Sequence, residues 1–387
     1  MPTASTPWRD RWLSWRDRCL TSAAFRRHAA RFPPTRAIAR KRAAQVFDLV
    51  AGFVYSQVLF ACVKLKLFDA LAEGPQKLDA LAARLGLENE AAERLLGAAV
   101  ALRLVERRGG DRYGLGALGA PLVGNDGLAA MIEHHSLLYA DLADPVALLR
   151  GNATGRLAAY WPYAGLADPA RASEAEVAPY SVLMASSQPL VADAILDAID
   201  LARHRCLLDV GGGDGSFLVA ASARAPRLEL LLFDLPAVAA LATQRFSAAG
   251  LQARARAAGG SFLVDSLPVG ADIVTLVRVL HDHDDARVMT LLRAVLKALP
   301  PGGTLVVAEP MAQTPGAEAM GDAYFGFYLL AMGRGLPRTC ARLIEMLGAA
   351  GFEAIRSLAT AQPLQTRLLV ARTPSSKTLN AKTVKPD

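Results

Sequence analysis

The stretch RVLHDHDDARV, residues 278–288, places two histidines and three aspartates at five consecutive positions. Such side chains can ligate a metal, transfer a proton or cap a helix. The sequence offers no obvious further set of metal ligands, so we predict no metal site. A helix that begins near Asp284 would use Asp284 or Asp285 as its cap and leave Asp282 as a turn residue. His281 is then the candidate for proton transfer, the alternative being a buried imidazole bonded to a backbone carbonyl.

A glycine-rich stretch, LLDVGGGDGSF at residues 207–217, is the second candidate for chemistry. Gly211, Gly213 and Gly215 allow the backbone to turn sharply and to approach a ligand closely. A dinucleotide-binding G-x-G-x-x-G would need glycine where Ser216 stands, and the pattern here is D-x-G-x-G-x-G. This order resembles the signature of S-adenosylmethionine (SAM) methyltransferases, so SAM is the predicted cofactor. The alternative is a turn that only connects two elements.

Three carboxylates end or follow predicted strands. Asp209 opens the glycine pattern and is expected to face the methionine end of the cofactor, and Asp234 ends LLFDLP, where it can accept hydrogen bonds from both ribose hydroxyls. Glu309 ends VVAEP, and adjacent strands lie about 5 Å apart. We therefore expect Glu309 to hold the His281 tautomer whose other ring nitrogen accepts a proton.

The elements that position these residues follow from hydrophobic periodicity. From Arg205 onward, apolar strands alternate with helices, which indicates a parallel sheet covered on both faces, with its ligand at the carboxyl ends of the strands. Residues 43–170 are mostly helical and include helix, turn, helix and a hairpin at Gly109 and Gly110, a winged-helix arrangement. Such modules often bind DNA, but residues 81–105 have few cations on any face, which favours packing against protein.

Composition limits the class of protein. The 387 residues are 52% hydrophobic and 20% charged, which indicates a globular chain of two domains, because single cores stop growing near roughly 250 to 300 residues. The longest apolar run, LVAGFVYSQVLFACV at residues 49–63, is shorter than the roughly 18 to 20 residues of a membrane span, and we predict a buried helix. Four scattered cysteines without CxxC spacing favour a cytoplasmic location.

The first 42 residues are the basic part of the chain. They contain eleven Arg or Lys and two Asp residues, a net charge of +9, whereas the whole chain carries +7. Trp8, Trp12 and Trp15 recur at helical spacing among the arginines. This pattern suits peripheral contact with a membrane interface, and a helix whose Trp face packs on its own protein is the alternative. Nucleic acid is not an expected partner.

Five motifs together resemble those of the metal-independent O-methyltransferases related to the caffeate and acetylserotonin enzymes: LLDVGGGDGSF, FDLP, GGSFLVDSLP, RVLHDHDD and GGTLVVAEP. The resemblance covers about residues 45–372. It implies an α/β, Rossmann-like class I SAM methyltransferase domain with a seven-stranded sheet, preceded by a mainly helical, winged-helix-containing domain that forms a homodimer. It also implies that His281 is the base, that Arg278 contacts the cofactor and that Met184 lies near the reacting centre.

The chain departs from this family at several positions. Ser261 and Phe262 stand where the family has aspartate and methionine around the adenine, and His283 replaces a tryptophan. We keep Ser261 and Phe262 as predicted cofactor contacts. Pro337 stands where the family often has a second acidic residue, which leaves Glu309 to orient the base.

Within the family, the N-terminal segment and residues 316–352 resemble the bacterial demethylspheroidene (1-hydroxycarotenoid) O-methyltransferases, which methylate the tertiary 1-hydroxyl of acyclic carotenoids. The resemblance implies a hydrophobic hydroxycarotenoid acceptor, carotenoid biosynthesis, and a peripheral position on the inner, photosynthetic membrane. The predicted acceptor-binding residues have few charges among them, although a core helix would look similar. They are Met320, Tyr324, Phe325, Tyr328 and Met332.

We thus predict a basic segment at 1–42, a dimerisation domain at 43–175, a SAM-binding domain at 176–373 and a disordered tail at 374–387. Two other functions remain open. One is O-methylation of a soluble phenol or polyketide. The other is a non-catalytic regulator that binds a ligand through its winged-helix module.

Overall fold

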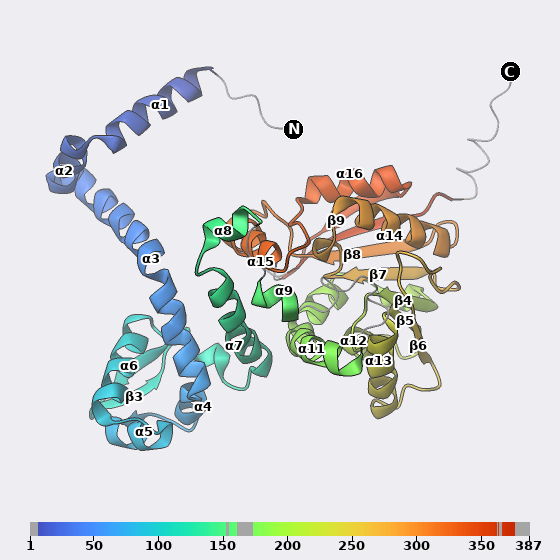
Figure 1. Cartoon of the computed structure of the whole chain (residues 1–387), viewed down its shortest axis with the longest axis horizontal. Helices are drawn as coiled ribbons and strands as arrows, with labels where there is room; N and C mark the ends of the chain where they lie inside the picture. Colours follow the sequence, from blue (N-terminus) through green and yellow to red (C-terminus); the bar gives the residue numbers. More distant parts are fainter. Residues whose placement is uncertain (1–6, 152–154, 161–172, 362, 364–365, 376–387) are drawn as a thin grey trace. The chain divides into compact units, whose positions relative to one another are not determined.

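The computed structural model describes residues 7–151, 155–160, 173–361, 363 and 366–375, with the backbone alone described at 7, 174–180, 182 and 190. The chain divides into two compact units, Met1–Gly124 and Asn125–Asp387, each of which can be followed by its colours in Figure 1. The four sequence-based domain boundaries remain predictions. Most of the expected C-terminal tail lies outside the described residues.

The N-terminal unit combines helices with a small sheet. Its strands run in the order β1-β3-β2 and all pair antiparallel. The predicted helix, turn, helix and hairpin are present, and the hairpin turns where Gly110 and Asp111 have φ of 71° and 55°. The elements are α1 (Pro7–Thr21), α2 (Ala23–Arg31), α3 (Pro33–Lys64), α4 (Leu67–Ala72), β1 (Gln76–Lys77), α5 (Leu78–Leu85), α6 (Asn89–Ala101), β2 (Val105–Arg108), β3 (Arg112–Leu115) and η1 (Ala120–Leu122).

The apolar part of α3 is exposed, so the predicted burial of this helix is wrong for the chain taken alone. Only Cys62 and Val63 of α3 are buried, whereas Leu49 and Phe53 are 85% and 68% exposed. Among the described residues, α3 is also the one helix long and apolar enough to cross a membrane, which the shorter apolar run in the sequence did not indicate. An apolar pattern predicts burial but does not say what buries it.

The C-terminal unit contains the predicted seven-stranded sheet. The order is β6-β5-β4-β7-β8-β10-β9. β4 to β8 pair in parallel, but β10 runs antiparallel to β8 and β9, so the expectation of an all-parallel sheet is wrong at this edge. The strands are β4 (Cys206–Val210), β5 (Glu229–Asp234), β6 (Ala255–Gly259), β7 (Ile273–Val277), β8 (Thr304–Glu309), β9 (Glu353–Leu358) and β10 (Arg367–Arg372).

Helices cover both faces of this sheet (Figure 1). Alternate strand residues point to opposite faces, and Leu207 and Leu208 accordingly belong to different buried clusters. One cluster contains buried residues of α11, α12 and α13, and the other contains buried residues of α14 and α16. The helical elements are α7 (Asp126–Asp141), α8 (Pro145–Leu149), α9 (Arg156–Tyr160), α11 (Glu174–Leu196), η3 (Leu201–Arg203), α12 (Ser216–Arg224), α13 (Pro236–Ala248), η4 (Leu280–Asp282), α14 (Asp285–Ala298), the π-helix η5 (Ala319–Tyr324), α15 (Phe325–Ala331) and α16 (Cys340–Ala350).

The segment that carries His281 differs from the expected strand end. β7 ends at Val277, and Arg278 has a left-handed φ of 56° that turns the chain out of the sheet. His281 therefore lies in the short 3₁₀ turn η4 rather than at the strand terminus. The predicted helix start is confirmed, because the Asp284 side chain accepts a hydrogen bond from the Arg287 backbone N–H at 2.9 Å.

Candidate active site

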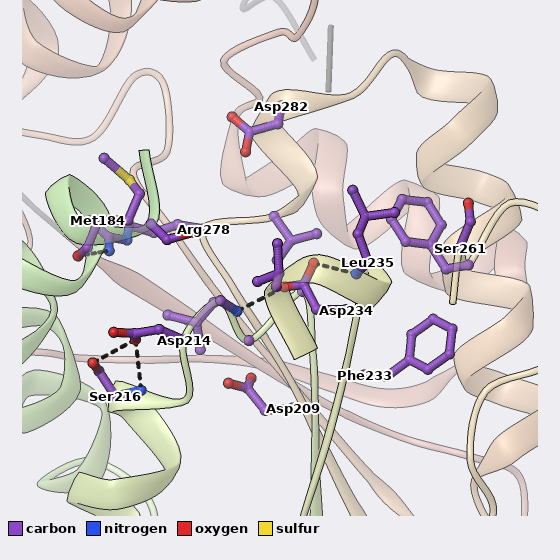
Figure 2. Close-up of a pocket in the computed structure, with 18 of the residues that line it drawn as sticks. Met184, Asp209, Asp214, Ser216, Phe233, Asp234, Leu235, Ser261, Arg278 and Asp282 are labelled. Carbon is purple, nitrogen blue, oxygen red and sulfur yellow. Dashed lines mark hydrogen bonds between the residues drawn. The ribbon is translucent and has the colours of Figure 1, made fainter. Parts of the chain in front are cut away.

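A cavity lies at the carboxyl ends of β4, β5 and β7, and Figure 2 shows part of its lining. The predicted cofactor residues in this lining are Met184, Asp209, Gly211, Gly213, Asp234, Ser261, Phe262 and Arg278. Gly215 is not among the lining residues. Its φ is 82°, and a Cβ there would come within 2.6 Å of the Phe246 ring. Gly215 thus permits close packing of the first turn of α12 on α13.

The glycine loop keeps the floor of the cavity open. Gly211 and Gly213 have φ of 70° and 60°, which glycine adopts at little cost. A Cβ on Gly213 would meet nothing within 4 Å, whereas one on Gly212 would lie 2.7 Å from Asp209 Oδ2. The loop therefore leaves room for a ligand beside its backbone.

Asp209 is buried at the end of β4 with one oxygen unused. Its Oδ1 accepts a hydrogen bond from the Thr275 hydroxyl at 2.6 Å, and its Oδ2 has no hydrogen-bond partner among the described residues. Burial raises the Asp209 pKa to about 7, although the Thr275 hydrogen bond opposes the shift. A buried acceptor without a donor is costly, so this oxygen is suited to a cationic or N–H group of a ligand.

Asp234, at the end of β5, holds the glycine loop by a hydrogen bond. Its Oδ2 accepts from the Gly213 N–H at 2.8 Å and its Oδ1 from the Leu235 N–H at 2.7 Å (Figure 2). Burial raises the Asp234 pKa to about 6, and the two backbone hydrogen bonds limit the rise. Each carboxylate oxygen retains a second lone pair that can accept a hydroxyl.

The remaining cofactor candidates have partners in the protein. Arg278 donates to the Ser187 hydroxyl and to the Met184 carbonyl, at 2.9 and 3.2 Å, which ties the end of β7 to α11. The Phe262 ring meets the His283 ring edge-on, with 5.1 Å between centroids. His283 also lines this cavity. The sequence indicated only that His283 stands where the family has a tryptophan.

His281 lies between two carboxylates. Its Nδ1 hydrogen-bonds Glu309 Oε2, and Glu309 Oε1 accepts the backbone N–H groups of Val279 and Leu280 at 2.9 and 2.7 Å. On the other side, His281 Nε2 is 3.1 Å from Asp282 Oδ1, within ion-pair distance but without hydrogen-bond alignment. Sequence reasoning treated Asp282 as a turn residue and missed this contact.

The electrostatics of this group favour a charged imidazole. Burial alone lowers the His281 pKa, but the negative charges of Asp282 and Glu309 outweigh burial and raise the pKa to about 10. At neutral pH the imidazole is therefore protonated in the ligand-free protein. Asp282 lines the cavity, whereas His281 lies directly behind it and is not part of the lining.

Arg338 fixes the backbone on which His281 sits, another role that the sequence did not indicate. The buried guanidinium donates to the carbonyls of Leu280 and His283 at 2.7 and 2.6 Å and pairs with Asp285 at 2.8 Å. The sequence feature that could have indicated this role is the arginine directly after Pro337. These bonds hold both ends of the turn η4.

Four of the predicted acceptor residues lie on η5 and α15, and Met332 follows as the C-cap of α15. The Phe325 ring is 5.9 Å from the His281 ring, centroid to centroid, and Tyr324 and Tyr328 are stacked at 5.6 Å. Tyr328 and Met332 belong to a buried cluster, and Met320 is partly buried. None of the five lines the cofactor cavity.

Two histidines that sequence reasoning passed over hold the tyrosines. His134 Nε2 is 3.0 Å from the Tyr328 hydroxyl, and His135 Nε2 is 2.7 Å from the Tyr324 hydroxyl. Burial lowers the His134 pKa to about 4 and also lowers that of His135, so both imidazoles are neutral. The adjacent pair in IEHHSLL was the only signal.

Comparisons with known proteins agree with this architecture. The chain matches the O-methyltransferase domain over residues 139–353 and the O-methyltransferase dimerisation domain over residues 47–125. It is 45% identical over 358 residues to demethylspheroidene O-methyltransferase of Cereibacter sphaeroides, with 92% of this chain and 94% of the relative covered. Identity to the enzyme of the same name from Rhodobacter capsulatus is 42%, with 88% and 85% covered.

Among solved structures, human N-acetylserotonin methyltransferase in complex with SAM is 27% identical. Its TM-score is 0.72, with 86% of this chain and 98% of that chain covered. The predicted fold is thereby confirmed: a class I methyltransferase sheet preceded by a helical dimerisation region. This chain belongs to the O-methyltransferase family.

Proposed function

We propose that this protein transfers a methyl group from SAM to the tertiary 1-hydroxyl of acyclic hydroxycarotenoids, with His281 as general base. The observation that carries this proposal is the 45% identity to the Cereibacter demethylspheroidene enzyme along 94% of its length. A match of that extent includes the acceptor side as well as the cofactor side. The apolar, aromatic character of η5 and α15 supports a polyene acceptor.

The chain uses SAM, which supplies a methyl group made electrophilic by a cationic sulfur. The residues of the cavity fit this cofactor. Asp209 offers its unpaired, buried Oδ2 to the ammonium of the methionine part, and Asp234 offers lone pairs to the ribose hydroxyls. Gly213 leaves the space that a bulky ligand needs.

The acceptor hydroxyl loses its proton as the methyl is transferred. A tertiary alcohol is far less acidic than an imidazolium, whose ordinary pKa is about 6.5, so free alkoxide does not form first. His281 takes the proton on Nε2 while Glu309 holds Nδ1. General-base assistance of this kind contributes roughly 10² to 10⁴ in rate, and alignment of the hydroxyl with the methyl contributes up to roughly 7 to 11 kcal/mol.

The test of this function is transfer of labelled methyl from SAM to defined acceptors. Acyclic 1-hydroxycarotenoids in lipid vesicles should accept label at the 1-oxygen, and simple phenols and hydroxylated polyketides should not. Labelled phenols with unlabelled carotenoids would favour the soluble-acceptor alternative. Absence of transfer to every acceptor, together with sequence-specific DNA binding, would favour the regulator.

The N-terminal unit supports a homodimer. The match to the dimerisation domain begins at residue 47, within the exposed apolar part of α3. Exposed apolar patches of this kind mark interaction surfaces. We assign the stretch around Leu49 and Phe53 to a second copy of the chain, which size-exclusion chromatography with light scattering tests directly.

The first helix supports peripheral contact with an anionic membrane. Trp8, Trp12 and Trp15 are 71%, 53% and 56% exposed, so the alternative in which their face packs on the protein itself has no support here. The arginines around them would each add about 1 kcal/mol near an anionic surface. An acceptor dissolved in lipid gives this helix a purpose.

Vesicle co-sedimentation distinguishes this contact from a solvated helix. The full-length protein should sediment with vesicles that contain anionic lipid and less with neutral ones, and the triple change W8A/W12A/W15A should abolish the difference. The matched control F25A/F32A changes two other exposed aromatics, on α2 and just after it. Equal sedimentation of all proteins would overturn the membrane proposal.

A further inference from the structure

Asp282 connects the cofactor cavity to the candidate base. Asp282 lines the cavity, and its Oδ1 lies 3.1 Å from His281 Nε2. Figure 2 shows Asp282 on the segment above the cavity, in the same view as Arg278 and Asp234. Asp282 thus occupies the space beside His281 Nε2 in which the acceptor hydroxyl would have to lie to give up its proton.

The two carboxylates beside His281 are held very differently. Both oxygens of Glu309 have hydrogen-bond partners, and the side chain is 3% exposed. Asp282 Oδ1 is buried but has no hydrogen bond in the part of the chain that the structure describes. Glu309 is fixed by three hydrogen bonds, whereas among the described residues Asp282 is held by the His281 ion pair without a hydrogen bond. Asp282 is therefore the side chain of the two that can turn toward a new cationic neighbour.

A protonated imidazole cannot act as a base. With a carboxylate beside each ring nitrogen, His281 holds its Nε2 proton in the ligand-free state. Asp282 and Glu309 are the charged groups that set this state, and the half-buried His283 and the buried Tyr328 also interact with the charge of Asp282. Arg278 and Arg287 are the cations among the lining residues of the cavity. The mechanism therefore needs an event that removes this proton.

We propose that Asp282 is a positioning residue that couples cofactor charge to the protonation of His281. Asp282 turns toward the cationic cofactor, the Nε2–H bond of His281 breaks, and a buffer base takes the proton. The neutral imidazole, still bonded to Glu309 through Nδ1, then accepts the acceptor's proton. This inference rests on His281 being the base of the proposed function.

The inference predicts a difference between SAM and its demethylated product, S-adenosylhomocysteine. Both carry the same amino group, carboxylate and nucleoside, but only SAM has the cationic sulfur, which makes its ammonium the more acidic of the two. The proton balance of each amino group is therefore measured on the free ligand and subtracted. Asp209 and Asp234, with pKa values of about 7 and 6, are already largely ionised at pH 8.5 and add little to the difference. The release that remains with SAM reports on His281.

The experiment is isothermal titration calorimetry of the full-length protein at pH 8.5, in buffers of low and high ionisation enthalpy. SAM should release between about half a proton and one proton more than S-adenosylhomocysteine, because an imidazolium with a pKa near 10 is almost fully protonated at that pH. Asp282→Asn should abolish the difference, because it removes the charge that stabilises the imidazolium. Asp284→Asn, which keeps an N-cap residue, should retain it.

Several outcomes would overturn the inference: equal proton release with both ligands, no release with either, or full release in Asp282→Asn. His281→Gln gives a second check, because it removes the titrating group and should also abolish the difference. Carotenoid methylation is assayed in parallel. SAM-specific proton release without methylation of hydroxycarotenoids would reject the proposed acceptor and leave the role of Asp282 intact. Methylation of hydroxycarotenoids without that release would support the acceptor and reject the role of Asp282.

Discussion

The cofactor side and the acceptor side of the site hold their side chains in different ways. On the cofactor side, Asp209 and Asp234 are fixed by Thr275 and by backbone N–H groups at the ends of neighbouring strands. On the acceptor side, Tyr324 and Tyr328 are held by histidines 189 and 194 residues earlier in the chain. A short motif can thus encode the cofactor side, whereas the acceptor side exists only in the folded chain.

His281 stands between the two sides, so its replacement should have the largest effect. We expect His281→Gln to lower kcat by roughly 10² to 10⁴, because general-base assistance is lost, while SAM binding is retained. Single-turnover methyl transfer with saturating SAM measures the rate, and calorimetry measures binding. A matched loss of SAM affinity would assign His281 to the structure rather than to catalysis.

Asp234→Ala should act on the cofactor side alone. Hydrogen bonds to a charged group contribute about 1.5 to 3 kcal/mol, so the Kd for S-adenosylhomocysteine should rise by roughly 10 to 100-fold. At saturating SAM, kcat should change little. Unchanged affinity in a direct titration would argue against the ribose role of Asp234.

On the cofactor side, ligand affinity and the stability of the ligand-free protein should depend on pH in opposite directions. The folded pKa values of Asp209 and Asp234, about 7 and 6, lie above those of ordinary carboxyls. Protonation removes the charges that the cofactor needs, so affinity for S-adenosylhomocysteine should fall as pH drops from 7.5 to 5.5. The ligand-free protein should instead lose stability from these groups as pH rises from about 4 to 7, because burial opposes their ionisation.

Asp209→Asn separates these pH effects from the titration of other groups. The variant should bind the ligand less tightly at pH 7.5 and show a weaker pH dependence of Kd. Binding and thermal unfolding measured across the same pH series provide both observables. A wild-type pH dependence in the variant would show that other residues cause it.

Changes on the acceptor side should have the smallest effects. Tyr324→Phe and His135→Phe each remove one partner of a single hydrogen bond, and we expect the KM for the carotenoid to rise roughly 2 to 10-fold, in line with about 0.5 to 1.5 kcal/mol per bond. SAM affinity should not change. The double variant should resemble the singles, because both remove the same contact, and additive effects would contradict the pairing.

The same contrast explains what the sequence predicted. Glycine positions, strand ends and the helix cap at Asp284 follow from local patterns, and the sheet follows from strand and helix alternation. The pairing of His135 with Tyr324 depends on distant segments meeting, which no local pattern records. The exposure of α3 was missed because apolar periodicity predicts a buried face without identifying its partner.

The turn after β7 was predicted less well than the strand itself. Val279 and Leu280 continue the apolar pattern after Arg278, so the pattern extended the strand to His281. The left-handed φ of Arg278 ends it at Val277 instead. This turn brings the carboxylate of Asp282 next to the imidazole, a contact between sequence neighbours that helix and strand periodicities do not encode.

The central claim is that the acceptor hydroxyl lies between His281 and the cofactor's methyl position. The structure of a complex with S-adenosylhomocysteine and a 1-hydroxycarotenoid tests it most directly. We predict that the 1-oxygen lies roughly 2.6 to 3.2 Å from His281 Nε2. A bound hydroxyl out of reach of His281 would contradict this account.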